Sequence, residues 1–121
     1  AKEKSENIDY ISAHGTATMF NDDMESHALQ RMGLDSTPVN SFKGYFGHTL
    51  GAAGVLETAA AVGSMKNNIL IGTKGFQVKG TAKPIKVIKT SKSQPINHCL
   101  KIASGFGGCN AGILLSKDGT F

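Results

Sequence analysis

Two successive strand–loop–helix units constrain the fold of this chain more than any other sequence feature. In the first unit, Ile8–Ala13 predicts a short buried strand that ends at a His-Gly pair. A helix is expected from Asp22 to about Met32. Asp22 and Glu25 have the spacing of a capping box at its start, and Gly33 can end it.

The second unit repeats this order. Pro38–Ser41 predicts a strand, Phe42–His48 a loop, and Thr49–Lys66 a helix rich in Ala and Gly. Strand, helix, strand, helix is typical of an α/β layer with parallel strands.

The sequence pattern changes after residue 67. Asn68–Thr73 predicts a short strand, and residues 74–95 predict a long polar connection with one strand at Ile85–Ile88. His98–Ala103 and Ala111–Ser116 predict two further strands. The short Gly-rich turn between them indicates an antiparallel pair.

Composition excludes several classes of protein. With 121 residues, 40% of them hydrophobic and 18% charged, residues 1–121 are expected to form one globular domain. No apolar run approaches the ~20 residues of a membrane span, and no signal-peptide pattern is present, so we expect a cytoplasmic location. Two cysteines are too few for a disulfide scaffold, and the four histidines do not cluster near them, so no metal site is expected.

Charge is distributed unevenly along the chain. Residues 1–57 hold four basic and eight acidic residues, whereas residues 58–121 hold nine Lys and one Asp. Six of these lysines lie between Lys74 and Lys92. A solvated loop is the ordinary interpretation, and a landing surface for an acidic partner is the alternative. Nucleic acid is not an expected partner, because the stretch has one aromatic residue and no Arg.

Three clusters could carry chemistry. The first, H-G-T-A-T at His14–Thr18, follows a predicted strand at the edge where open α/β sheets bind ligands. His14 can exchange a proton near neutral pH, and the hydroxyls of Thr16 and Thr18 can hold a polar ligand. Taken alone, a histidine that only ends a strand is the simpler interpretation.

The second and third clusters are rich in glycine. Lys43 and His48 flank one loop ahead of a Gly/Ala helix, whose positive end favours a neutral, donating His48. Close helix packing explains the small residues but not Lys43 and His48. In G-F-G-G-C-N, Gly105–Asn110, three glycines permit φ > 0 and favour a mobile loop with an apolar plug over a simple hairpin turn.

Together these clusters resemble the C-terminal half of the β-ketoacyl-acyl-carrier-protein synthases, a family with the thiolase fold that includes the polyketide ketosynthases. The family motifs H-G-T-x-T, N-D-x-x-E, K-x-x-x-G-H-x-x-G-A-A-G and G-F-G-G-x-N appear as His14–Thr18, Asn21–Glu25, Lys43–Gly54 and Gly105–Asn110. The resemblance covers Ile8 to about Lys117.

The resemblance implies an α/β fold, namely the partial C-terminal half of a thiolase-like fold: a mixed sheet with packed helices and a C-terminal antiparallel strand pair. It implies decarboxylative Claisen condensation of an acyl thioester with malonyl-acyl-carrier protein, in fatty acid or polyketide synthesis. No cofactor is permanently bound in this family, because the acyl carrier protein brings the phosphopantetheine arm. The full enzyme is expected to be a homodimer.

The resemblance also implies roles for single residues. His14 and His48 would hydrogen-bond the malonyl thioester oxygen and stabilise the enolate. Lys43 would hold His48 and the local water network in place. Glu25 would be the charge partner of Lys43, with Asp22 near it, and the capping-box interpretation of both acids stays open.

Further implied roles concern substrate binding. Thr16 and Thr18 would hydrogen-bond the phosphopantetheine arm. The backbone N–H of Phe106, between Gly105 and Gly107, would complete the oxyanion hole over the nucleophile. The Phe106 ring would act as the gate to the acyl pocket.

Departures from the family limit what this chain can do alone. The N-terminal half with the nucleophilic cysteine has no counterpart here, and the first residue is Ala1, so we expect a fragment that does not condense by itself. Cys99 and Cys109 are expected to be structural. Ser104 stands where the family often has a second Phe, which changes the acyl gate.

Two alternatives remain open. The chain could be a stand-alone protein that binds a carrier protein or completes a split synthase without catalysis of its own. It could also be a degradative thiolase, in which a similar G-H-x-x-G-A-x-G occurs, but H-G-T-x-T and Lys43 fit the ketosynthases better. Because half of its family's fold is missing, the isolated chain is expected to expose apolar surface and to self-associate.

Overall fold

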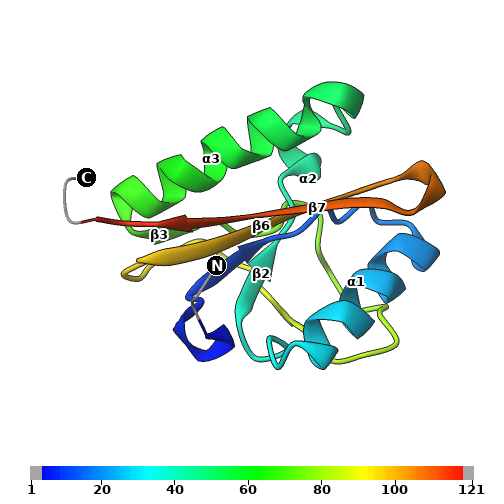
Figure 1. Ribbon diagram of the computed structural model, residues 1–121, viewed down its shortest axis with the longest axis horizontal. Coiled ribbons are helices and arrows are strands. Elements are labelled where there is room, and N and C mark those ends of the chain that lie inside the picture. The colour runs from blue at the N-terminus through cyan, green and yellow to red at the C-terminus, as the bar shows by residue number, and fades with distance from the viewer. Residues whose placement is uncertain (1–3, 119–121) are drawn as a thin grey trace.

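The computed structural model describes residues 4–118 as a mixed sheet with a helix on each face (Figure 1). The larger elements are β1 (Tyr10–Ser12), α1 (Met19–Arg31), β2 (Pro38–Asn40), α2 (Lys43–Phe46), α3 (Ala53–Asn67), β3 (Ile69–Leu70), β4 (Lys86–Val87), β5 (Lys92–Ser93), β6 (His98–Gly105) and β7 (Cys109–Ser116). Three single-turn 3₁₀ helices, η1 (Ser5–Asn7), η2 (Leu50–Ala52) and η3 (Phe106–Gly108), complete the order.

The main sheet has five strands in the order β4-β2-β1-β6-β7. The first four are parallel to their neighbours, with Ile11 of β1 opposite Val39 of β2 and Leu100 of β6. β7 runs antiparallel to β6 at one edge, and β3 pairs with β5 in a separate antiparallel pair. The predicted parallel α/β layer and the predicted C-terminal antiparallel pair are therefore confirmed.

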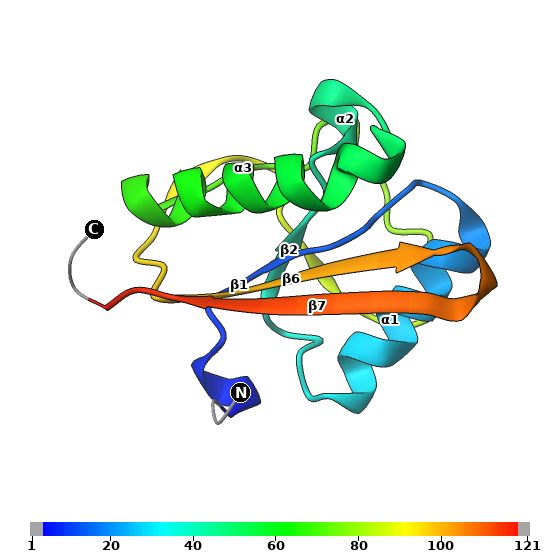
Figure 2. The same ribbon diagram turned by 45° about the horizontal axis from the view of Figure 1, so that its top comes forward.

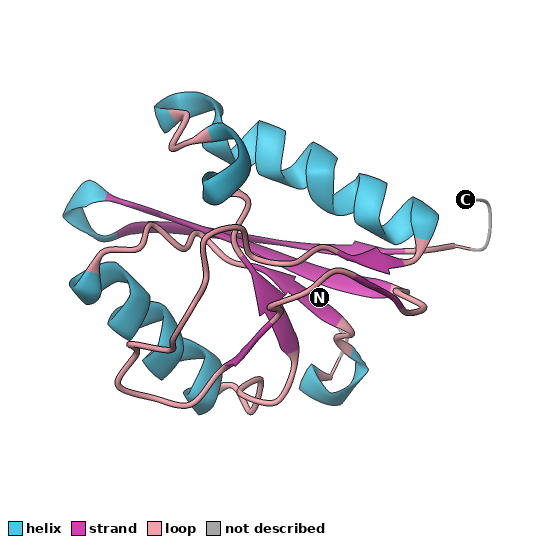
Figure 3. Cartoon of the chain, turned by 180° about the vertical axis from the view of Figure 1, so that it is seen from behind, coloured by secondary structure: helices cyan, strands magenta, loops and turns pink. Residues whose placement is uncertain are grey.

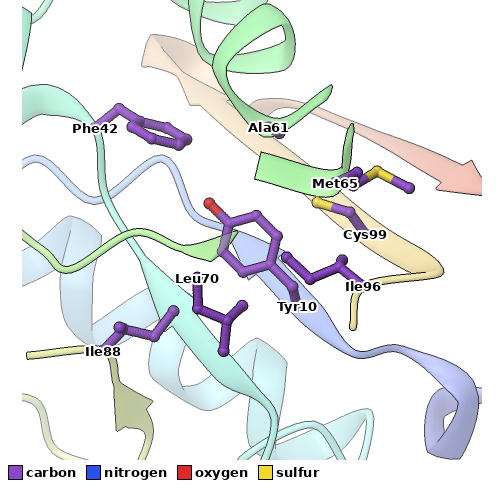
Figure 4. Close-up of a cluster of buried hydrophobic side chains, with 8 residues drawn as sticks. All are labelled: Tyr10, Phe42, Ala61, Met65, Leu70, Ile88, Ile96 and Cys99. Carbon is purple, nitrogen blue, oxygen red and sulfur yellow. The ribbon is translucent and has the colours of Figure 1, made fainter. Parts of the chain in front are cut away.

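Because successive side chains of a strand point to opposite faces of the sheet, the strands contribute to two hydrophobic cores, one under α3 and one under α1. On the α3 face, Tyr10 and Cys99 pack with Ala61 and Met65 (Figure 4). On the α1 face, Ile11 packs in a second cluster; its buried members are Ile11, Ala13, Leu29, Leu34 and Val39. The view from behind shows α1 and α3 on opposite faces (Figure 3). Cys99 is thus a small core residue, as expected.

The start of α1 corrects one sequence prediction. The helix begins at Met19 rather than Asp22, and Thr18 at the N-cap position makes no side-chain capping bond. Asp22 and Glu25 therefore lie inside the helix and do not form a capping box. The predicted end is right, because Gly33 has a φ of +68° and its N–H donates to the Gln30 carbonyl.

The second unit also differs in detail from its prediction. The expected loop Phe42–His48 contains the short helix α2, and α3 begins at Ala53 after the turn η2. β4 confirms the strand expected within Ile85–Ile88, whereas β5 was not predicted. Within residues 4–118, none of the helices has the length and apolar character required to cross a membrane.

Candidate functional site

The loops that follow β1 and β2 meet at the carboxyl edge of the sheet. Right after β1 the chain turns at Gly15, whose φ is +45°. A Cβ at this position would lie 2.6 Å from the Cβ of Ser41, so the close approach of the two loops requires glycine. The Ser41 hydroxyl donates to the Gly15 carbonyl at 2.6 Å and fastens the loops together.

The first turns of α1 supply carboxylates that hold the His14 loop. Glu25 is 4% exposed, and its two oxygens accept the backbone N–H groups of His14 and Gly15, both at 2.7 Å. Asp22 accepts the N–H of Thr16 at 3.1 Å. Burial raises the pKa of Glu25, and the hydrogen bonds from the Gly15 and His14 amides oppose that rise. Glu25 therefore positions the His14 backbone instead of pairing with Lys43.

Lys43 has a different carboxylate as its partner. Its Nζ lies 2.5 Å from Glu57 Oε1, and the side chains of Lys43 and Glu57 are 8% and 0% exposed. The same ammonium donates to the His14 carbonyl at 2.5 Å and lies 3.2 Å from His14 Nδ1. In the part of the chain that the structure describes, Lys43 thus contacts His14, and the implied contact with His48 is not seen.

Sequence reasoning missed Glu57 and the second lysine that it binds. Glu57 Oε2 lies 2.7 Å from the Nζ of Lys101 on β6, whose side chain is 2% exposed. This contact is an ion pair without good hydrogen-bond geometry, since Oε2 accepts no hydrogen bond within residues 4–118. One signal was available: Glu57 is the one charged residue in the small and apolar run 49–65.

The two histidines stand edge to face at this site. Their ring centroids are 5.1 Å apart with an interplanar angle of 85°. His14 is buried and His48 is exposed. An ammonium can only donate, so the contact of Lys43 assigns an unprotonated Nδ1 to His14. The N–H of Leu50 donates to His48 Nδ1 at 3.1 Å. Each neutral ring therefore carries its proton on Nε2.

The charge of His14 is set by its surroundings. Burial lowers the pKa of His14, and the Lys43 ammonium lowers it further. Glu57 acts in the opposite direction. His14 is therefore neutral at physiological pH and offers a hydrogen-bond donor instead of a positive charge.

Thr16 and Thr18 follow the His14 turn and line a cavity. Their hydroxyl oxygens are 2.6 Å apart and exposed. A cavity of about 790 Å³ opens between the sheet, α1 and the loop at residues 73–81. Thr16, Thr18 and Lys43 line it, whereas neither histidine does. The structure thus places the hydroxyl pair where a polar chain that enters the cavity can reach it.

The glycine loop forms the tip of the β6–β7 hairpin. Phe106 is fully exposed, and Gly107 and Gly108 each have a φ of +78°. Gly105 is extended at φ −125°, so two of the three glycines use the positive φ that glycine permits. Because β6 is parallel to β1, this tip lies at the same edge of the sheet as the His14 loop (Figure 2).

The two cysteines differ in their surroundings. Burial raises the pKa of Cys99 to about 12, which makes its thiol inert at neutral pH. Cys109 is free and exposed, so the expectation that it is a structural residue finds no packing to support it. Across the described residues 4–118, His, Cys, Asp and Glu form no group of three or more suited to a metal ion.

Comparisons with known proteins agree with this geometry. The family model for the beta-ketoacyl synthase C-terminal domain matches residues 1–77. The putative mitochondrial 3-oxoacyl-[acyl-carrier-protein] synthase of Schizosaccharomyces pombe is 35% identical over 119 residues, which cover 91% of this chain and 28% of that protein.

Two solved structures are also similar. A beta-ketoacyl synthase from Burkholderia phymatum matches with a TM-score of 0.92 and 32% identity, covering 97% of this chain and 29% of that one. A ketosynthase solved in complex with its type II PKS acyl-carrier protein matches with a TM-score of 0.86 and 31% identity, covering 92% and 28%. The chain therefore spans less than a third of the length of the relatives it matches.

Proposed function

Because the chain belongs to the β-ketoacyl synthase family, where it matches the C-terminal domain, we propose that it supplies the decarboxylation site of a condensing enzyme. The reaction is the decarboxylative Claisen condensation of an acyl thioester with malonyl-acyl-carrier protein. The observation that carries the proposal is the edge-to-face pair His14 and His48, in which a donor contacts Nδ1 of each ring and so leaves Nε2 to carry the proton.

Two preplaced donors suit the charge that this reaction develops. When the bond between the malonyl Cα and its carboxylate breaks, carbon dioxide leaves and the electron pair moves onto the thioester oxygen. Two Nε2–H groups directed at that oxygen stabilise the enolate without reorganising. The enolate carbon then attacks the acyl thioester carbonyl, and the nucleophilic thiolate leaves.

The surrounding groups keep His14 in its donating form. Lys43 donates toward Nδ1, so the proton stays on Nε2, and it also fixes the His14 backbone by donating to its carbonyl. Glu25 fixes the backbone of the same residue from the other side. Asp22 holds the N–H of Thr16 in the same loop. Lys43, Glu25 and Asp22 thus act as positioning residues in this proposal.

The phosphopantetheine arm of a carrier protein is the proposed ligand of Thr16 and Thr18. Its amide groups can bond to the adjacent hydroxyls at the rim of the cavity. The similar ketosynthase that was solved with its acyl-carrier protein supports this partner class. The arm arrives with the carrier protein, and no permanently bound cofactor is part of the proposal.

The proposal assigns the nucleophilic cysteine to an N-terminal ketosynthase half, because Cys99 is buried with a raised pKa. The exposed Phe106, with Gly105 and Gly107 beside it, would then face that half as oxyanion donor and acyl gate. Residues 1–121 would act as the C-terminal domain of a homodimeric enzyme, and a cytoplasmic location stays a prediction. Peptide mapping in the source cells for residues upstream of Ala1 tests this arrangement.

The activity test uses the isolated chain. Malonyl-carrier protein is incubated with it, and conversion to acetyl-carrier protein is followed by mass spectrometry. We expect slow decarboxylation that His48→Ala removes, and no carbon–carbon bond formation with an added acyl-carrier protein. His27→Ala, which changes an exposed histidine on α1, is the matched control. Decarboxylation that survives His48→Ala would refute the histidine assignment, and condensation by this chain would refute the need for a cysteine half.

A carrier-protein-binding partner without catalysis is the second candidate function. Of the six lysines between Lys74 and Lys92, five are exposed and Lys83 is half-buried. If these lysines dock an acidic carrier protein, the dissociation constant should rise steeply as salt is raised from about 50 to about 300 mM, because the electrostatic screening length falls from roughly 14 Å to roughly 6 Å over that range. Binding that does not depend on salt would show that the lysines do not take part.

A further inference from the structure

A second buried lysine shares one carboxylate with Lys43. Lys101 extends from β6 toward α3, and its Nζ lies 2.7 Å from Glu57 Oε2. The same ammonium lies 3.3 Å from the Ala13 carbonyl and also contacts the carbonyl of Ile102. Lysine is almost never buried this fully without a partner, so this position calls for a physical reason.

Charge balance alone does not explain Lys101. Glu57 already neutralises Lys43, and a second buried ammonium adds a desolvation penalty. Burial is the main cause that lowers the pKa of Lys101, and Glu57 opposes it. What the second lysine adds is geometric: it occupies Oε2, so that Oε1 stays directed at Lys43.

We propose that Lys101 is a positioning residue, which holds Glu57 from the far side and thereby fixes the Lys43 ammonium against His14. The contacts are continuous: Lys101 Nζ to Glu57 Oε2 at 2.7 Å, Glu57 Oε1 to Lys43 Nζ at 2.5 Å, and Lys43 Nζ to His14 Nδ1 at 3.2 Å. The inference rests on the proposed function only in taking His14 as a hydrogen-bond donor.

The proposal has an electrostatic consequence at His14. The charged or titratable groups that face His14 are Lys43 from α2, Glu57 from α3, Lys101 from β6, His48 from the loop before η2, and Glu25 from α1. Loss of Lys101 removes a positive charge and leaves Glu57 less compensated. Both changes favour the protonated imidazole, so the titration midpoint of His14 should rise.

The first test is an NMR pH titration of His14 in the full 121-residue chain. Lys101→Met keeps a long unbranched side chain and removes the charge. We expect the titration midpoint of His14 to rise by roughly half a pH unit or more, because one positive charge is lost from the buried group that contains Lys43 and Glu57. Lys86→Met, which removes an exposed lysine on β4, is the matched control and should leave the midpoint unchanged. An unchanged midpoint in folded Lys101→Met overturns the proposal.

The second test asks whether Lys43 is held in place. An amine-acetylating reagent is applied to the chain, and modification of Lys43 is measured by mass spectrometry against the exposed Lys89. We expect strong protection of Lys43 in the wild type and a several-fold rise in Lys101→Met. Protection that stays intact overturns the positioning role, even where the midpoint moves. Lys101→Gln, which keeps a polar end beside Glu57, takes the place of Lys101→Met if that variant does not fold.

These two tests are independent of the proposed reaction. Neither uses a thioester, a carrier protein or a cysteine half. A failed decarboxylation assay with a shifted His14 midpoint would therefore reject the reaction and keep the role of Lys101. Observed decarboxylation with an unchanged His14 midpoint in Lys101→Met would reject the positioning role of Lys101 and keep the proposed reaction.

Discussion

Replacing Glu57 with glutamine is expected to lower the free energy of unfolding by about 3–5 kcal/mol. The substitution keeps the size of the side chain but removes the negative charge that Lys43 and Lys101 share. Two ammonium groups then remain in a site where they are 8% and 2% exposed. The amide oxygen can accept a hydrogen bond from one ammonium, but the amide NH2 then faces the other, and neither charge is compensated. A loss of this size is a large part of the stability of a small domain.

Urea unfolding followed by circular dichroism measures this loss. Glu6→Gln is the control, because the Glu6 carboxylate pairs with Lys4 at the surface and is 72% exposed. We expect it to change stability by less than about 0.5 kcal/mol. Glu57→Asp keeps the charge and shortens its reach, so it should fall between the wild type and Glu57→Gln. Equal stability of Glu57→Gln and the wild type would contradict the buried ion pairs.

The second large effect is expected at the histidines. In a complete condensing enzyme that contains this chain, His14→Ala should slow malonyl decarboxylation by about 10²–10³-fold, the usual cost of one oxyanion donor. His48→Ala should have a similar effect. The double variant should lose less than the product of the two, because both donors serve one oxygen. His27→Ala should leave the rate unchanged.

The pH dependence of the decarboxylation rate should show that the pKa of His14 is lowered. Burial and Lys43 lower the pKa of His14, so the ring stays neutral as the pH falls through the ordinary histidine value of about 6.5. The fall in rate that protonation of His14 causes should therefore occur below that pH. A His14→Gln variant, whose amide can donate but does not titrate, should lose this decline. A rate in His14→Ala equal to the wild type would refute the donor role.

Much of the fold followed from local pattern. The strands predicted at residues 8–13 and 38–41 became the parallel neighbours β1 and β2, and the glycine turn at 104–110 joined the antiparallel pair β6 and β7. The start of α1 was misplaced because Asp22 and Glu25 have capping-box spacing. In the structure their carboxylates accept N–H groups of the preceding loop instead of the helix's own first turn.

The carboxylate that pairs with Lys43 could not be predicted from the sequence. Glu25 and Glu57 lie 18 and 14 residues from Lys43, and neither spacing states which carboxylate can reach it. The answer depends on which face of the sheet each helix covers. α1 covers one face and directs Glu25 at the His14 backbone, whereas α3 covers the other face and brings Glu57 between two lysines.

The sequence by itself determined the strand and helix order, the family and the identity of the two histidines, because periodicity and motif spacing are local properties of the chain. Only the tertiary structure decided that Lys43 contacts His14, that Glu57 is its counterion and that Lys101 completes the group. These contacts join four segments of the chain, and the group spans 87 residues from His14 to Lys101. Their geometry is set by how α3 crosses the sheet above β1 and β6, which no local pattern encodes.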